Sequence, residues 1–325
     1  MGSFSETAGI LFPGSAAILI GCGALVLFGM LWNVCNIVMI VPQLCQSKDR
    51  QCVDFIILCI SVSNVLLDIS AFGYLFINQF ELHCHTELHT IIRIVFYVFF
   101  SATCLSFWSI TWLCVFYCVK IVSFPMAFFV KLKRNIPSVI NVALILTVVS
   151  CLILYIPFFF FSLPTHEEND TLNIKCPELS VHFSKPINRN LYLYTFLCFL
   201  CPIPLSFMLT TSISLVSHLC KHTRSMKKNE TSFQSRNAYM LIVKMIISLV
   251  VVYLVTIIMA FICFIIQEKS TDLANHIIIP NMAFFCLATG VLLTITNKNL
   301  KEKFMAACCC KKTQTDPANL SERLN

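Results

Sequence analysis

One short stretch of the sequence carries side chains that proteins use to bind metal ions. His83-Cys84-His85-Thr86-Glu87-Leu88-His89 combines imidazole, thiol and carboxylate groups, all of which can be zinc ligands. Its order does not match the His-Glu-x-x-His pattern of zinc proteases, and no second cluster of such residues accompanies it. A polar loop is therefore favoured over a metal site, and we expect no metal and no cofactor.

A second group of chemically capable residues lies within apolar runs. Asp68 can carry a charge there, and burying an unpaired carboxylate is costly in free energy. Three interpretations stay open for it: it binds a cationic ligand, it binds sodium, or it is protonated and hydrogen-bonded. Asn33 and Asn64 lie in similar runs, and hydrogen bonds between helices, worth about 1 kcal/mol each, account for them.

The elements that must position these residues are membrane helices. Hydrophobic residues make up 58% of the 325-residue chain and charged residues 12%, with a mean hydropathy of +0.81. Because about 20 apolar residues cross the hydrocarbon core, we predict seven spans, at about 16–40, 55–77, 94–119, 138–161, 191–217, 238–266 and 276–296. The runs lack the short alternating pattern of barrel strands. The sequence therefore predicts an all-α membrane protein, a seven-transmembrane-helix bundle.

The basic residues predict the orientation of this bundle. With the N-terminus outside and the C-terminus cytoplasmic, the inner segments hold 17 Lys and Arg residues and the outer segments 4, as the positive-inside rule requires. The expected domains are a short extracellular N-terminus at 1–15, a seven-transmembrane domain at 16–296, and a cytoplasmic amphipathic helix and tail at 297–325. Membrane lipid headgroups account for the net charge of +7, so we expect no nucleic-acid partner.

Candidate modification sites on the outer side follow from this orientation. Asn169 begins an Asn-Asp-Thr sequon in the longest outer loop and is the predicted glycosylation site. Sequons at Asn229 and Asn319 lie on predicted inner segments and should stay unmodified. Cys84 and Cys176 lie in outer loops, where an oxidising compartment could pair them in a disulfide or leave both thiols free.

The segment after the last span has the pattern of an interfacial helix. Lys298 to Ala307 alternates basic and apolar residues and leads into Cys308, Cys309 and Cys310. An amphipathic helix here would lie along the inner leaflet, and juxtamembrane cysteines beside basic residues are candidates for palmitoylation. A free, reduced cluster is the alternative.

The third span carries an aromatic stripe with one hydroxyl. Its members recur at helical spacing on one face: Phe96, Phe99, Phe100, Thr103 and Phe107. Directed inward, they would line an aromatic cavity, and directed elsewhere they are core or lipid contacts. Periodicity does not choose between these directions.

The inner end of the third span carries the most specific pattern. Its residues resemble the third-helix pattern of type 2 (bitter) taste receptors, W..T.L.VFY..KI..F, at Trp108, Thr111, Leu113, Val115, Phe116, Tyr117, Lys120, Ile121 and Phe124. Further matches follow in the family's order: Pro204-Leu205-Ser206, then Ser217, Leu219, Lys221, His222, Thr223, Arg224 and Met226, then Lys244, Ser248 and Tyr253, and finally Asn297 with Leu300-Lys301. The resemblance covers nearly all of the seven-helix region.

This resemblance implies a G protein-coupled receptor of the plasma membrane, and not an enzyme. The partners it implies are a small apolar bitter ligand and a heterotrimeric G protein of the gustducin type, while a homo- or hetero-oligomeric state is left open. Candidate ligand contacts, chosen by helix depth and by analogy, are Asp68, Phe96, Phe99, Phe100, Thr103 and Tyr253. Candidate residues facing the G protein are Tyr117, Lys120, Leu219, His222 and Lys244.

Two departures from the family pattern indicate a divergent member. Asn64 stands where the family usually carries an arginine, and Thr289-Gly290 stands where the seventh helix usually reads His-Ser. Both positions belong to the family's usual polar network between helices 1, 2 and 7. Vomeronasal type 1 receptors are the nearest confusable family, and the motifs of the third and fifth helices favour taste. A multi-pass transporter would need paired buried carboxylates or paired broken helices, which the sequence does not offer.

Overall fold

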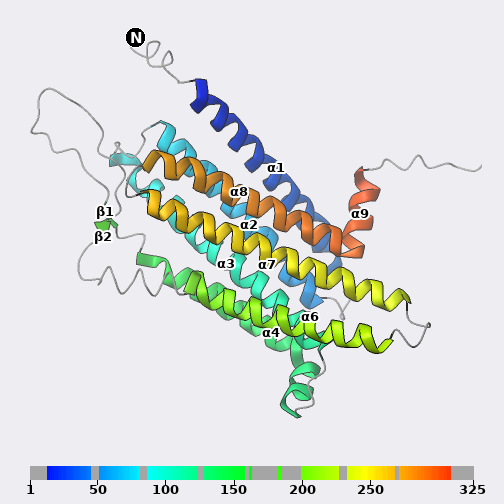
Figure 1. Ribbon diagram of the computed structural model, residues 1–325. Coiled ribbons are helices and arrows are strands. Elements are labelled where there is room, and N and C mark those ends of the chain that lie inside the picture. The colour runs from blue at the N-terminus through cyan, green and yellow to red at the C-terminus, as the bar shows by residue number, and fades with distance from the viewer. Residues whose placement is uncertain are drawn as a thin grey trace, which may run out of the picture.

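The computed structural model of the protein is a bundle of long helices (Figure 1). It describes residues 13–44, 51–80, 86–122, 127–157, 161–162, 182–183, 199–226, 233–267 and 271–308. The elements in chain order are α1 (Pro13–Leu44), α2 (Gln51–Gln79), the short 3-10 helix η3 (Thr86–Leu88), α3 (His89–Ile121), α4 (Ala127–Leu154), β1 (Phe161–Ser162), β2 (His182–Phe183), α6 (Pro202–Met226), α7 (Phe233–Gln267), α8 (Thr271–Thr296) and α9 (Lys298–Cys308).

Seven of these helices are long and apolar enough to cross a membrane. Their candidate spans are Ile20–Leu44, Gln51–Gln79, His89–Ile121, Val130–Leu154, Pro202–Lys221, Met240–Cys263 and Ile277–Thr296. The predicted all-α architecture and the seven spans are therefore confirmed. Large apolar side chains such as Leu31 and Val38 of α1 lie 59% and 65% exposed on the outside of the bundle, where lipid would surround them.

The fourth span differs from its predicted boundaries. We predicted this span at about 138–161 as a run with few or no charges. In the structure α4 begins at Ala127, passes through Pro137 and ends at Leu154. Membrane helices tolerate proline in their interior. The Cys52 thiol of α2 lies 3.9 Å from the carbonyl oxygen of Pro137.

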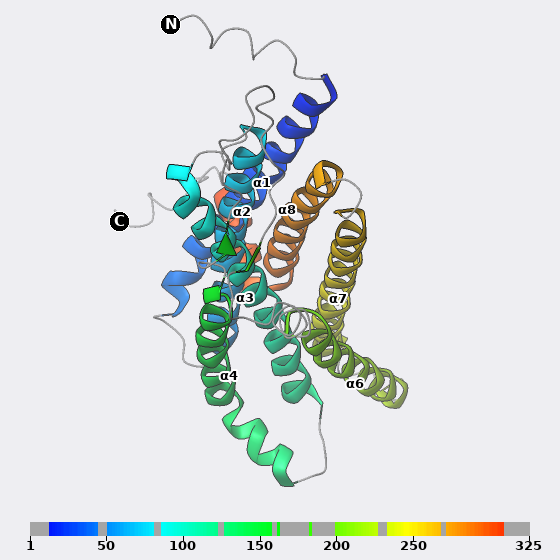
Figure 2. The same cartoon turned by 90° about the vertical axis from the view of Figure 1, so that its left-hand side faces the viewer.

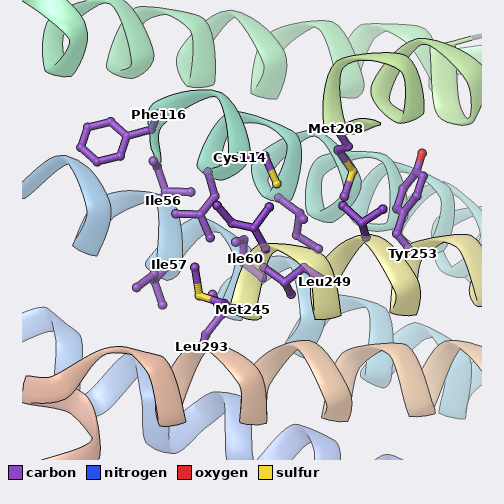
Figure 3. Packing of buried hydrophobic residues seen from close by; sticks show 14 of the residues in the cluster. Ile56, Ile57, Ile60, Cys114, Phe116, Met208, Met245, Leu249, Tyr253 and Leu293 are labelled. Atoms are coloured by element: carbon purple, nitrogen blue, oxygen red, sulfur yellow. The ribbon is translucent and has the colours of Figure 1, made fainter. Parts of the chain in front are cut away.

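The bundle is organised around α3. This helix packs against α2, α4, α6 and α7, while α8 packs against α1, α2 and α7. Figure 2 shows α3 between α4 on one side and α6 on the other. Buried side chains of α2, α3, α6, α7 and α8, with a few from α1, α4 and α9, form an apolar core, part of which is shown in Figure 3.

The two ends of the bundle carry different small elements. β1 pairs with β2 in an antiparallel register, Phe161 opposite Phe183, at the end of the bundle opposite α9 (Figure 1). α9 turns away from the axis of α8 directly after the last span, and the ring of its Phe304 lies 4.6 Å from the ring of Trp32 in α1. The helix predicted after the last span is confirmed, and its contact with lipid stays a prediction.

Candidate functional site

The aromatic stripe of α3 first extends toward α2 and α4. The ring centroid of Phe96 lies 5.3 Å from that of Tyr74 in α2. The ring of Phe100 stacks against Tyr155, directly after α4, at 6.3 Å. Both phenylalanines belong to one apolar cluster on this side of α3, in which Phe96 is buried and Phe100 is half-buried.

The other members of the stripe face the interior of the bundle. Phe99 is half-buried among residues of α2 and α8. Phe107 packs its ring 5.0 Å from Phe285 in α8 and 4.7 Å from Tyr253 in α7. Thr103 is 2% exposed and donates its hydroxyl to the carbonyl of Phe99 at 2.7 Å. The stripe therefore contacts α2 and α4 at one end and α7 and α8 at the other, and the rings of Phe99 and Phe100, 5.4 Å apart, contact each other.

Tyr253 holds the beginning of α6 from the neighbouring helix. Its fully buried side chain donates the hydroxyl to the carbonyl oxygen of Leu200 at 3.1 Å, and Figure 3 shows it directed from α7 toward α6. The usual helical donor to this carbonyl would be residue 204, which is Pro204 and has no N–H. Trp108 of α3 donates its indole N–H to the nearby carbonyl of Phe199 at 3.1 Å. The proline-containing start of α6 is therefore tied to both α3 and α7.

Asn64 is the centre of a buried polar network that joins α1, α2, α3 and α8. Its amide donates to the hydroxyl oxygen of Thr289 at 2.9 Å and to Asn33 Oδ1 at 3.3 Å. Its own Oδ1 accepts a hydrogen bond from the hydroxyl of Ser106 at 2.7 Å. All four side chains are 0% exposed. The predicted roles of Asn33 and Asn64 are confirmed. Thr289 was noted in the sequence as a departure from the family pattern, whereas Ser106 gave no signal beyond a hydroxyl group in an apolar run.

A second set of hydrogen bonds ties α1 to α8 nearer to α9. The indole N–H of Trp32 donates to the hydroxyl oxygen of Thr294 at 2.9 Å, and this hydroxyl donates to Asn36 Oδ1 at 2.7 Å. The amide of Asn36 donates in turn to the carbonyl of Gly290 at 3.1 Å. The partners of Asn36 lie more than 250 positions away in the sequence, so the pattern of α1 alone does not predict them.

Asp68 lies one helical turn along α2 from Asn64 and is 0% exposed. Its neighbours on the adjacent helices are Gly29 of α1 and the thiol of Cys286 in α8. A thiol is a weak donor, and among the described residues neither carboxylate oxygen has a partner that meets hydrogen-bond geometry. The side chain is thus enclosed by α1, α2 and α8.

Comparison with known proteins identifies the family. Residues 14–312 match the taste receptor protein (TAS2R) family. The chain belongs to this family. With its seven candidate membrane-spanning helices, it is a multi-pass protein of the plasma membrane.

Similar proteins include taste receptors of birds and primates. The chain is 33% identical over 163 residues to taste receptor type 2 member 40 of Gallus gallus, a match that covers 48% of this chain and 51% of that protein. It is 27% identical over 315 residues to taste receptor type 2 member 3 of Papio hamadryas, a match that covers 93% of this chain and 96% of that protein. It is 24% identical over 285 residues to taste receptor type 2 member 2 of Homo sapiens, a match that covers 83% of this chain and 88% of that protein. The chain thus spans about half the length of the first of these relatives.

The two departures from the taste receptor pattern meet within the Asn64 network. A Cβ added at Gly290 would lie 2.9 Å from Asn33 Oδ1, so the glycine provides the space that the Asn33 amide occupies. Asn64 contacts both Asn33 and Thr289 directly. The departures are therefore complementary, and this taste receptor keeps a polar link between α1, α2 and α8 with different residues.

The predicted G-protein-facing residues differ in exposure. Lys120 at the end of α3 and Lys244 of α7 are exposed, and Tyr117 is half-buried. Leu219 of α6 is 9% exposed and packs into the core. His222 lies on α6, and its side chain is outside the described part of the chain. The two lysines therefore offer the accessible charges of this set.

Several predicted sites lie outside the described residues. They are Asn169, the two outer cysteines Cys84 and Cys176, and Cys309 and Cys310. Cys308 is the last residue of α9, so the predicted acylation site begins at the end of that helix. Glycosylation, disulfide pairing and palmitoylation therefore stay predictions.

Proposed function

We propose that the protein is a bitter taste receptor that couples to a heterotrimeric G protein of the gustducin type. A small apolar agonist enters from the extracellular side and favours a conformer whose inner helix ends activate the G protein. The observation that carries this proposal is membership of the taste receptor family over residues 14–312. The agonist acts by binding one conformer more tightly than the other, since equal affinity for both would shift nothing.

The proposed agonist site uses the outer part of α3 and its neighbours. The candidate contacts are Asp68, Phe96, Phe99, Phe100, Thr103 and Tyr253. Phe99 and Phe100 are half-buried, so their rings keep accessible area for a ligand. Tyr253 and Asp68 are 0% exposed, so in this conformer they act through the packing of the bundle. Aromatic rings provide mainly apolar contact, which suits an agonist with few polar groups.

Substitution of the two accessible rings tests this site. Phe99→Ala and Phe100→Ala should each raise the agonist concentration for half-maximal response about fivefold, because an aromatic contact is worth about 1 kcal/mol. Calcium signalling in cells that express a gustducin-type Gα, with a panel of bitter compounds, is the measurement. Phe72→Ala, which removes a ring 47% exposed on α2, is the matched control. Equal surface expression with unchanged dose dependence in both α3 variants would reject the site.

The inner helix ends provide the proposed docking face for the G protein. Tyr117, Lys120, Leu219, His222 and Lys244 make up this set, and Lys120 and Lys244 present exposed charges. Lys120→Ala with Lys244→Ala should lower agonist-induced nucleotide exchange on Gα while agonist binding is unchanged. If the unmodified receptor caused no nucleotide exchange on Gα and instead carried a substrate across the membrane, the protein would be a transporter.

We also propose lipid attachment at the end of α9. Cys308, Cys309 and Cys310 follow a helix that carries Lys298, Lys301 and Lys303, and anionic lipid would attract these lysines. Acyl exchange with hydroxylamine should detect thioester-linked palmitate on the receptor, and the triple Cys→Ser variant should lose it. An unmodified wild-type receptor in the same cells would contradict the proposal.

A further inference from the structure

Two buried cysteines meet where α3 packs against α4. The thiol of Cys151 in α4 donates to the sulfur of Cys104 in α3, and the two sulfur atoms lie 3.3 Å apart. Cys104 is 0% exposed and Cys151 is 1% exposed, and both are free thiols. They are 47 positions apart in the sequence, so the fold and not local spacing brings them together. The proposed receptor function uses neither thiol.

Contacts on both sides of the cysteine pair fix the register of α3 against α4. One helical turn toward the start of α3, the ring of Phe100 stacks against Tyr155, directly after α4, at 6.3 Å. Toward the other end of α3, Trp112 donates its indole N–H to the hydroxyl oxygen of Thr147 in α4 at 3.0 Å. A rotation of either helix that separated the cysteines would break these contacts. The two sulfur atoms are therefore held next to each other.

Thiols at this separation are close to the geometry of a disulfide. The S–S bond is about 2.0 Å long, so the two sulfur atoms have to approach each other by about 1.3 Å. Rotations about the Cα–Cβ bonds of the two side chains supply such a shift. Among the described residues no group of three or more His, Cys, Asp or Glu side chains could hold a metal ion. Oxidation of the pair is therefore favoured over metal binding.

The surroundings of the pair select the oxidant. Cys151 lies three residues before Leu154, the last residue of α4, and is therefore close to one end of the bundle. Its neighbours are apolar, since Phe96, Trp108 and Tyr155 belong to the same cluster. Local opening at the end of α4 would admit a small uncharged oxidant such as hydrogen peroxide, whereas a charged oxidant such as glutathione disulfide would have to leave water for an apolar site. We expect the reaction to be slow, because the thiolate is the reactive form and burial disfavours it.

We propose that Cys104 and Cys151 form a redox pair that hydrogen peroxide converts to a disulfide between α3 and α4. The sulfur of one cysteine attacks a peroxide oxygen, the O–O bond breaks, and a sulfenic acid and one water form. The sulfur of the second cysteine attacks the sulfenic sulfur, the S–S bond forms, and the S–O bond breaks to release a second water. The two thiols lose two electrons and two protons in total, and peroxide is reduced to water. This site is argued from the contact of the two thiols and does not depend on the proposed taste function.

Mass spectrometry of the purified full-length protein tests the pair. The protein in detergent is treated with hydrogen peroxide, its remaining thiols are alkylated in denaturant, and it is digested without reductant. The wild type should yield a cross-linked peptide that contains Cys104 and Cys151 and is lighter by two hydrogen atoms than the two free peptides together. Dithiothreitol should separate the two peptides. Recovery of both cysteines as alkylated thiols, or as separate sulfinic acids, would overturn the proposal.

Serine variants assign the response to this pair. Cys104→Ser and Cys151→Ser should each lose the cross-linked peptide. Cys263→Ser removes another buried thiol, 4% exposed in α7, and as the matched control it should keep the peptide. The peptide from the wild type is informative even if a serine variant folds poorly.

Thermal stability gives a second measurement of the same bond. A disulfide that closes a loop of the unfolded chain stabilises the fold, so peroxide should raise the wild-type Tm by several degrees and dithiothreitol should reverse the rise. The Tm of Cys104→Ser and of Cys151→Ser should not rise with peroxide, whereas that of Cys263→Ser should rise like the wild type. A rise that persists in Cys104→Ser and Cys151→Ser would come from other cysteines and would contradict the assignment.

Discussion

At the scale of single residues, Gly290 is important because it has no side chain and so leaves room for the Asn33 amide. Asn33 donates to the carbonyls of Gly29 and Cys286, at 2.9 and 3.1 Å, and accepts from Asn64. Any larger residue at 290 would meet its amide at 2.9 to 3.2 Å. Because the Asn33 amide is held by three hydrogen bonds, it cannot move aside without losing some of them.

We therefore expect Gly290→Ala to lower the free energy of unfolding by about 1–2 kcal/mol, the value of one or two buried hydrogen bonds. The measurement is the Tm of the purified protein. Gly21→Ala on α1 is the control, since an added Cβ there meets nothing within 4 Å, and its Tm should be unchanged. If the two variants had the same Tm, close packing at Gly290 would not contribute to stability.

The sequence predicted part of this residue-scale chemistry. Asn33 and Asn64 were identified because an amide in an apolar run needs a partner. Ser106 was not, because a hydroxyl can bond to its own helix, as Thr103 does with the carbonyl of Phe99. Thr289 was noted only through the family pattern, and its bond to Asn64 was not predicted. Which hydroxyl reaches across to another helix depends on rotation about the helix axis, and a single sequence does not contain that information.

At the scale of elements, the beginning of α6 depends on two other helices. Pro204 leaves the Leu200 carbonyl without its helical donor, and Tyr253 of α7 supplies a hydroxyl in its place at 3.1 Å. The sequence placed this span in the correct region and included Pro204 in a family motif. It gave no sign that a tyrosine 53 positions away would satisfy the freed carbonyl.

We expect Tyr253→Phe to destabilise the protein by about 1 kcal/mol, because a buried carbonyl loses its donor while the ring packing is kept. In a Pro204→Ala background residue 204 has an N–H of its own, so the same change should cost clearly less. A double-mutant cycle of denaturation midpoints measures the coupling. Additive effects of the two substitutions would contradict the assigned partnership.

Element boundaries also show where sequence patterns are weak. The run with few charges predicted the fourth span at about 138–161, yet α4 extends from Ala127 to Leu154, because a helix can continue beyond the apolar run that crosses the lipid. The pattern for α9 was more informative, since basic and apolar residues alternate there in a way that suits one apolar face. Its contact with Trp32 through Phe304 was not predictable, because it depends on where α1 lies.

At the scale of the whole molecule, the basic residues predict which end of the bundle faces the cytoplasm. β1 and β2 lie at the end of the bundle opposite α9 (Figure 1). This arrangement agrees with the predicted spans, because three of them, α6, α7 and α8, separate β2 from α9, and an odd number of spans places the two elements on opposite sides. The absolute orientation is a prediction from the 17 inner and 4 outer basic residues.

Glycan mapping tests this orientation. In mammalian cells Asn169 should carry an N-linked glycan, so that glycosidase treatment reduces the apparent mass of the wild type and leaves Asn169→Gln unchanged. The sequons at Asn229 and Asn319 should be unoccupied because both lie on the predicted cytoplasmic side. A glycan on either of these would invert the orientation and remove the basis for a cytoplasmic G-protein face.

The sequence by itself determined the membrane class, the number of spans and the resemblance to taste receptors, because apolar length and short motifs are local properties of the chain. Tertiary structure alone decided which polar groups meet. Asn64 and Thr289 lie 225 positions apart, and their contact depends on how α2 and α8 are rotated and packed. The same packing brings Phe107 of the aromatic stripe against α7 and α8 and leaves Asp68 beside Gly29. The sequence of one helix gives the spacing of its side chains, but the neighbouring helices decide what each side chain contacts.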